Sequence, residues 1–211
     1  PSPYLPKDVN FSLGVAAFSA ARYTGSDERR LAAYPLLDAQ WRNGAFASTI
    51  SGIGYNFSKD PSLQYGLRMT VEAARDESRS DRLHGLGDVG TAIEPGAFLN
   101  YIVNQNYSLT SSIRYGSGVD HNGLQLSLGG RATTSLNTQH RLSASFGANW
   151  ANTSFAQSYF GVNATQSAAS GYNQYTPTAG LTDVKVGASW NWSIDSNWSL
   201  TTGASVKYLT G

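Results

Sequence analysis

The chain has 211 residues, and only 14 % of them are charged, against about 25 % in soluble domains. A formal net charge of +1 gives no reason to expect nucleic acid as a partner, and the absence of cysteine excludes a disulfide framework, thiolate metal sites and cysteine nucleophiles. No stretch approaches the ~20 apolar residues of a membrane helix.

Alternation of apolar and polar residues at period two dominates the chain and predicts an all-β fold. In 141–150, for example, Leu142, Ala144 and Phe146 alternate with Ser143, Ser145 and Gly147. Nine strands are predicted, in chain order, at 11–20, 45–57, 63–73, 93–103, 107–115, 123–134, 141–150, 181–194 and 198–208.

Segment 34–41, followed by the turn residues 42–44, also has strand character. We expect it to form a hairpin inside the first long loop, and we expect a bulge where 45–57 changes phase between Ile50 and Ile53. Nine strands leave a closed antiparallel barrel one strand short. The expectation is therefore ten strands, with the last one following Gly211, and twelve strands with 34–41 spanning is the alternative.

Three architectures have strands in which apolar and polar residues alternate in this way: a soluble β-sandwich, a lipocalin-like barrel and a transmembrane barrel. The predicted strands run for roughly 10 residues or more, which matches the 9–11 that a membrane strand needs. The polar face carries mainly Gly, Ser, Thr and Asn, and short turns alternate with long loops at 74–91 and 151–180. These features favour one antiparallel transmembrane β-barrel domain over 1–211.

Aromatic residues gather near the strand ends, as in the two interfacial girdles of a membrane barrel. The predicted girdles are Tyr55, Phe57, Tyr65, Tyr101, Tyr107, Trp190, Trp192 and Trp198 at one end, and Phe46, Tyr115, Trp150 and Tyr208 at the other.

The opposite phase of the strands predicts a polar lumen. Its charged residues are Arg68, Glu72, Glu94, Arg114, Arg131, Lys185 and Lys207, with Arg141 near the periplasmic rim. We expect a packed polar core in which Glu72 and Glu94 each neutralise an arginine, and the alternative is a narrow pore that favours anions.

No motif predicts catalysis, a cofactor or a metal. Gly85–Gly90 matches G-x-G-x-x-G but lacks the strand and helix that a nucleotide site requires, so a glycine-rich loop is expected. The histidines His84, His121 and His140 are expected in loops or turns without ligand spacing. A mixed-charge loop is predicted to be solvated and salt-bridged, with calcium binding as the alternative; its acids are Asp76, Glu77, Asp81 and Asp88, among Arg75, Arg79 and Arg82.

Five segments in order, YPLLDAQWRNGAFAS, SGIGYNF, HGLGDVG, SYFGVNATQSAASGY and KYLTG, resemble the MipA/OmpV family of Gram-negative outer-membrane proteins. The resemblance implies a cleaved leader, a further C-terminal strand, outer-membrane lipid as surroundings and no active site. It also implies a scaffold in peptidoglycan synthesis, with the lytic transglycosylase MltA and a penicillin-binding protein as partners. A surface adhesin using the long loops and a narrow solute pore are the alternative functions.

Overall fold

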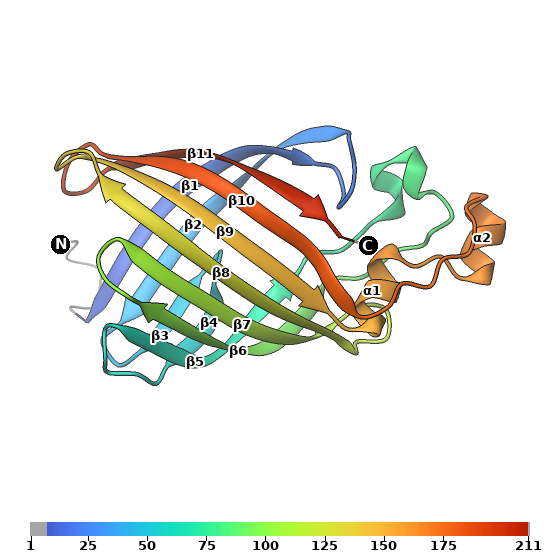
Figure 1. Ribbon diagram of the computed structural model, residues 1–211, viewed down its shortest axis with the longest axis horizontal. Coiled ribbons are helices and arrows are strands. Elements are labelled where there is room, and N and C mark those ends of the chain that lie inside the picture. Colours follow the sequence, from blue (N-terminus) through green and yellow to red (C-terminus); the bar gives the residue numbers. More distant parts are fainter. Residues whose placement is uncertain (1–7, 211) are drawn as a thin grey trace.

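A computed structural model of the chain describes residues 8–210. Eleven antiparallel strands form one sheet in which each strand pairs with its neighbours in sequence (Figure 1). The all-β antiparallel fold is thereby confirmed. The strands are β1 (Val9–Ala21), β2 (Arg29–Trp41), β3 (Ala45–Ser48), β4 (Gly52–Asn56), β5 (Leu63–Glu72), β6 (Ala92–Ile102), β7 (Tyr107–Ser117), β8 (Gly123–Ser135), β9 (His140–Ala151), β10 (Gly180–Ser193) and β11 (Ser199–Leu209).

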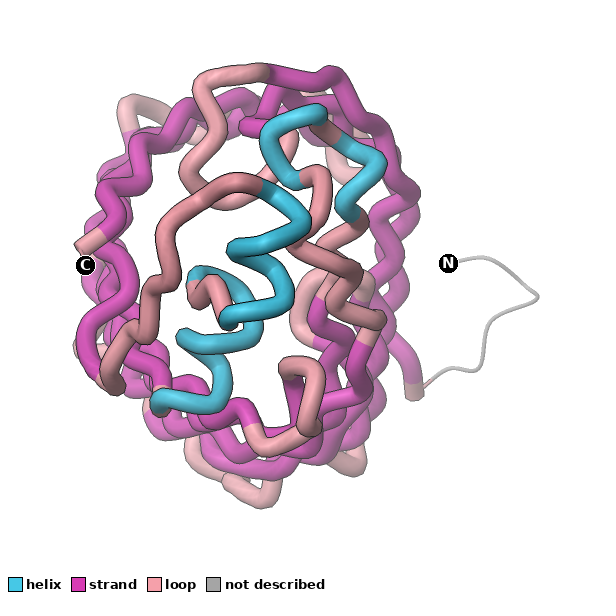
Figure 2. The backbone as a smooth tube through the Cα atoms, turned by 90° about the vertical axis from the view of Figure 1, so that its right-hand side faces the viewer, coloured by secondary structure: helices cyan, strands magenta, loops and turns pink. Residues whose placement is uncertain are grey.

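The sheet is rolled into a wall with a ring-shaped cross-section (Figure 2). The Leu209 side chain at the end of β11 lies close to Gly25 in the β1–β2 loop. A Cβ added at Gly25 would be 3.3 Å from the Cδ1 atom of Leu209. Among the described residues, β1 and β11 share no ladder, so they are the two edges of the sheet. No helix in this part of the chain combines the length and apolarity that a membrane crossing requires.

The count of nine strands is corrected to eleven. Residues 34–41 do not form a hairpin in the first loop, because β2 pairs with β1 along its whole length, from Val9↔Trp41 to Ala21↔Arg29. The single strand expected at 45–57 is instead the short hairpin β3–β4, of four and five residues. The strand expected at 45–57 is thus replaced by two half-length strands, and the hairpin expected at 34–41 is replaced by part of the full-length strand β2. The second change agrees with the alternative in which 34–41 spans the wall.

The β3–β4 turn explains the change of phase in the sequence. The Ser48 hydroxyl accepts hydrogen bonds from the Ile50 and Ser51 amides, and Thr49 bonds back to Leu37 of β2. Gly52 has φ +81°, a conformation that glycine adopts without strain. The two strands therefore reverse direction after Ser48 where we expected a bulge.

The short hairpin leaves a notch in the wall. On its other side from β4, β3 pairs with only three residues of β2, Asp38–Gln40. On its other side from β3, β4 pairs with only Gly66–Met69 of β5. Above the hairpin, the β5–β6 connection reaches the β1–β2 loop: Arg82 lies 2.7 Å from Asp27, and Arg22 donates to the Arg79 carbonyl at 3.1 Å. Loop contacts therefore bridge the notch at the end of the molecule that carries the long connections.

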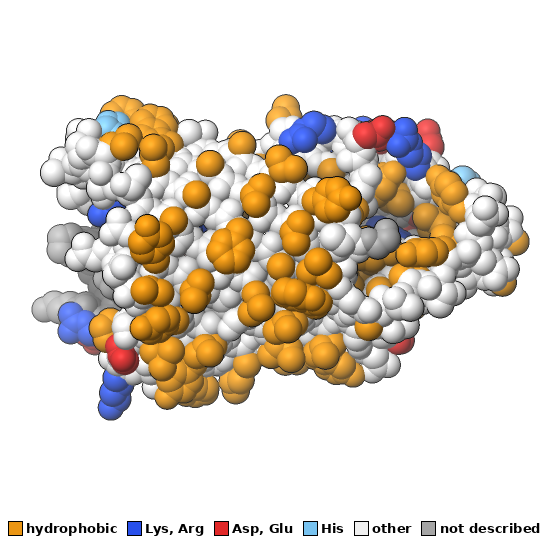
Figure 3. Space-filling view, in the orientation of Figure 1, with side chains coloured by type: hydrophobic (Ala, Val, Ile, Leu, Met, Phe, Trp, Pro, Cys, Tyr) orange, Lys and Arg blue, Asp and Glu red, His pale blue; other side chains and the backbone are white. Residues whose placement is uncertain are grey.

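Apolar side chains cover the outside of the wall, and charged side chains gather toward its ends (Figure 3). Val15, Val71 and Val186 are each at least 60 % exposed. Most of the buried apolar residues instead lie at the long-loop end, where they include Leu83, Val89, Phe155 and Ala156. The outer, apolar face of the wall is therefore exposed to its surroundings. The closest apolar packing lies among the connecting segments at the long-loop end.

Candidate functional site

A network of polar side chains inside the wall centres on Arg114 of β7. Its guanidinium lies 2.9 Å from the Glu94 carboxylate, 3.1 Å from that of Glu72 and 2.9 Å from the Gln125 amide oxygen. Gln125 donates in turn to Glu94 at 3.0 Å and to the Ser117 hydroxyl at 3.4 Å. The four strands β5–β8 each contribute to one continuous hydrogen-bonded group.

The alternation of each strand and the register between strands position this network. Arg114 lies directly opposite Gln125 on β8 and opposite Gly96 on β6. Gly96 leaves space for the arginine, since a Cβ there would lie 3.3 Å from Arg114 Cγ. Glu94 is 0 % exposed, and a carboxylate so deeply buried requires both its ion pair and its hydrogen bonds.

The sequence indicated the charged members of the network but not how they pair. Glu72 and Glu94 share one arginine, whereas we expected each to have its own. Gln125 and Ser117 are uncharged, so the charge pattern of the inward phase does not indicate them. The spacing of Gln125 from Arg131, six residues along one strand, was the signal that both lie on the same face.

A cap of connecting segments covers the network at the long-loop end (Figure 2). It contains two 3-10 turns, η1 (Glu77–Arg79) and η2 (Asp81–Leu83), and two helices, α1 (Thr153–Phe160) and α2 (Ala164–Ser170). Arg75 donates to the Tyr159 carbonyl at 2.8 Å, and Gln166 donates to the Leu86 carbonyl at 2.5 Å. The two long connections are therefore packed against each other.

Several buried polar atoms lack a hydrogen-bond partner among the described residues where the cap meets the wall. They are the Tyr159 hydroxyl, Arg75 Nε and Gln157 Oε1. Burial raises the pKa of Tyr159 to about 12, and the nearby Glu72 and Glu94 add to the effect. The phenol therefore stays neutral at physiological pH.

The acidic residues of the β5–β6 connection hold their own backbone in place. The Glu77 carboxylate accepts hydrogen bonds from the Gly85 and Gly87 amides at 3.1 and 2.9 Å, and Asp88 accepts from the Glu77 amide. The G-x-G amides thus surround an internal carboxylate. Within 8–210, no group of three or more His, Cys, Asp or Glu side chains is arranged to hold a metal ion.

The three histidines lie in different surroundings. His84 follows η2, and His121 lies in the β7–β8 turn with φ +58°. His140 was expected in a turn but is the first residue of β9, where its ring stacks on Trp190 and Trp192 at centroid distances of 5.4 and 6.0 Å. The stack results from the direct pairing of His140 with Trp192 across β9 and β10.

The remaining cations of the inward phase are dispersed along the wall. Lys207 lies 3.8 Å from Asp183, a carboxylate that the sequence prediction missed. The Arg68 guanidinium lies 5.7 Å from the centre of the Phe98 ring. Three further predicted residues make no ion pair to a described carboxylate. In register, Arg131 lies opposite Ser145, Arg141 lies opposite Asn191, and Lys185 lies opposite Lys207.

Phe46 was predicted in an outer girdle, and its position is corrected. Register places it opposite Gln40 and Gly54, and its ring packs on Phe98 inside the wall at 5.7 Å. The short β3 shifts the phase relative to the single strand that we expected. Tyr55, Tyr65, Tyr101 and Tyr107 lie on the opposite, exposed face.

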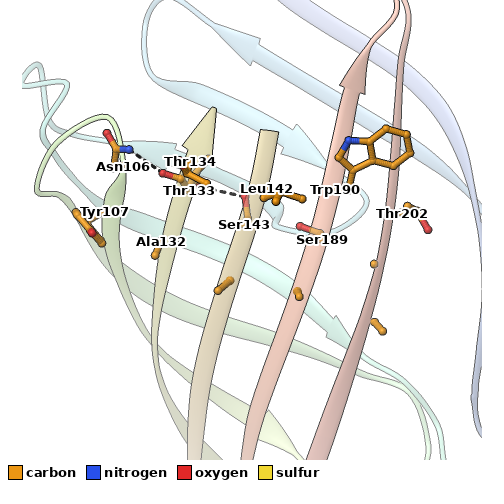
Figure 4. Close-up of a pocket in the computed structure, with 14 residues that line it drawn as sticks. Asn106, Tyr107, Ala132, Thr133, Thr134, Leu142, Ser143, Ser189, Trp190 and Thr202 are labelled. Atoms are coloured by element: carbon orange, nitrogen blue, oxygen red, sulfur yellow. Dashed lines mark hydrogen bonds between the residues drawn. The ribbon is translucent and has the colours of Figure 1, made fainter. Parts of the chain in front are cut away.

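A groove of about 790 Å³ crosses β8–β11 near the short-turn end (Figure 4). Four alanines paired in register, Ala132, Ala144, Ala188 and Ala204, form its low floor. Leu142 and Trp190 form one side. The groove has no charged lining residue and no histidine, so it offers no carboxylate, imidazole or amine to activate its hydroxyl groups.

Comparison with protein families finds a match over nearly the whole chain. The model described as MltA-interacting protein MipA matches residues 13–211. No curated protein and no solved structure matches the chain. Because the match extends from β1 through the capped wall to the end of β11, the chain belongs to the MipA family of MltA-interacting proteins.

Proposed function

We propose that the chain forms a single β-barrel domain in the outer membrane of a Gram-negative bacterium. The full-length strands contain 10 to 14 residues, enough to cross a bilayer at a tilt. The exposed apolar face of the wall would meet lipid, and the exposed tyrosines and tryptophans would lie at the two interfaces. In this arrangement the short turns face the periplasm and the cap faces outward.

The domain acts as a non-enzymatic scaffold that binds a lytic transglycosylase of the MltA type and, through the same assembly, a penicillin-binding protein. The single observation that carries this proposal is the match of nearly the whole chain to a family described by its interaction with MltA. The geometry is in keeping with a scaffold, because the inward-facing carboxylates bond to an arginine, a lysine and amides.

A periplasmic partner would meet the short-turn end of the wall. Arg42 lies there with its side chain 79 % exposed, and Lys59 lies in the β4–β5 turn. We expect these two cations to steer the partner, since exposed charges mainly set the association rate and orientation.

The test is capture of a purified MltA-type transglycosylase by the chain in detergent micelles. The double variant Arg42→Glu/Lys59→Glu should lose capture by about tenfold or more. The matched variant Arg30→Glu/Arg79→Glu, at the capped end, should capture normally. Failure of the unmodified chain to capture the enzyme refutes the scaffold role, and normal capture by the first variant refutes this surface alone.

The narrow-pore alternative is less well supported. The network around Arg114 and the cap above it occupy the long-loop end of the lumen, and Glu94 at their junction is fully buried. A conducting path would need both to move.

A further inference from the structure

A second pocket, with a polar lining, lies inside the wall at the short-turn end, away from the cap. Its volume is about 220 Å³, and residues of β2–β6 line it, including Asp38, Gln40, Gln64, Arg68, Phe98 and Asn100. The pocket is separate from the network around Arg114, none of whose members lines it.

Arg68 is the only cation in this lining, and it differs from Arg114 in its partners. Arg114 contacts both carboxylates of the network, whereas no carboxylate of the described residues lies within ion-pair distance of Arg68. Arg68 Nε is buried and has no hydrogen-bond partner in the described part of the chain. A charged group with an unpaired donor requires an explanation, and an anion bound at the other guanidinium nitrogens is one that the charge favours.

Packing holds the Arg68 guanidinium in place. It lies 5.7 Å from the centre of the Phe98 ring, and Phe98 in turn packs edge-on against Phe46. Gly54 provides the space, because a Cβ there would lie 2.8 Å from Arg68 Cβ. A guanidinium positioned in advance loses less entropy when it binds a planar anion.

Two amide side chains lie between Arg68 and the rim. Gln64 and Asn100 face each other directly across β5 and β6, and neither makes a side-chain hydrogen bond to a described residue. Each amide offers two donors and an acceptor, the set that a peptide bond needs. On the other side of the pocket, Gln40 donates to the Asp38 carboxylate at 3.0 Å.

We propose that this pocket binds the free carboxylate end of a short peptide, with Arg68 holding the carboxylate and Gln64 and Asn100 holding the last peptide bond. One guanidinium fork matches one carboxylate, whereas a phosphate dianion would bring a second charge into a pocket that contains Asp38. The volume admits the end of a peptide and excludes a folded domain. This binding goes beyond the scaffold role and does not depend on it.

The test is calorimetric titration of the full chain in detergent micelles with three probes: Ala-Ala-Ala with a free carboxylate, the same peptide as its C-terminal amide, and inorganic phosphate. The free peptide should bind at least about tenfold more tightly than the amide, as a hydrogen bond to a charged group implies. Equal binding of the amide overturns the proposal, and so does tighter binding of phosphate. This comparison needs no variant.

Variants assign the contact to Arg68. Arg68→Gln should weaken binding of the free peptide at least about tenfold, and Gln64→Ala at the rim should weaken it about threefold. Arg131→Gln, which removes an inward cation from another part of the wall, should bind normally. Normal binding by both Arg68→Gln and Gln64→Ala overturns the site. Loss of peptide binding leaves transglycosylase capture unchanged, so the two proposals fail separately.

Discussion

Arg114 shows what a single residue's place in an alternating sequence reveals. The phase of β7 is enough to predict that Arg114 faces inward with Glu72 and Glu94. It does not predict which carboxylates the arginine meets, because contacts across a wall depend on the register between strands. That register depends in turn on the turns and bulges, such as the shift between Tyr115 and Ser117, which the sequence leaves open.

Replacing Arg114 by methionine should lower the free energy of unfolding by about 3 kcal/mol, because it leaves Glu94 buried without its counter-ion. The free energy is measured by urea unfolding of the chain in lipid or detergent. The matched variant is Lys207→Met, since Lys207 is 46 % exposed and 3.8 Å from Asp183. Its loss should stay under about 1 kcal/mol. Equal losses in the two variants would contradict the importance assigned to burial.

At the scale of elements, the long strands other than β2 were predictable and the short ones were not. Most full-length strands extend over enough residues for period two to be recognised, as in β9 and β10. In β2 only 34–41 was recognised, and its pairing with β1 was not. The hairpin β3–β4 left only a change of phase, which a bulge produces as well. Helices α1 and α2, with eight and seven residues, are too short for a helical period to emerge. The capping box of Asn163 and Gln166 was the available signal for α2.

The β3–β4 turn should depend on Gly52. In Gly52→Ala the new Cβ would lie 2.1 Å from the Met69 carbonyl oxygen, on a residue with φ +81°, so we expect a loss of more than about 1 kcal/mol in the free energy of unfolding. Gly90→Ala serves as the control, because nothing lies within 4 Å of its added Cβ. That change should stay within about 0.5 kcal/mol. A tolerated alanine at position 52 would show that the turn differs from the one described.

For the molecule as a whole, the two faces of the wall followed from composition and alternation, but the cap did not. A polar, glycine-rich connection has the same composition whether it is solvated or packed. The contacts that order this one join residues far apart in sequence, such as the Tyr172 hydroxyl and the Arg82 carbonyl. Local patterns contain no information on such pairs.

The two faces should respond differently to charge. Val186→Arg places a cation on the exposed apolar face, where Val186 is 60 % exposed, and should cost about 2–4 kcal/mol in a bilayer. Ser189→Arg, on the inward phase of the same strand, should cost under about 1 kcal/mol. Unfolding of the two variants in lipid vesicles would measure both changes in the free energy of unfolding. If the chain is a folded monomer in lipid-free buffer and Val186→Arg costs as much there as in vesicles, the apolar face does not meet a bilayer.

The bridged notch above β3–β4 has a consequence for the order of assembly. Every ladder in the wall joins strands that follow one another in the chain, so the hairpins can form one by one from either end. The loop contacts join residues 55 apart at Arg82 and Asp27, and 84 apart at Arg75 and Tyr159. Before the wall exists, one exposed ion pair or hydrogen bond does not offset the entropy lost in closing such a loop. We therefore expect the cap to fold last, after the strands on both sides of it are already in place.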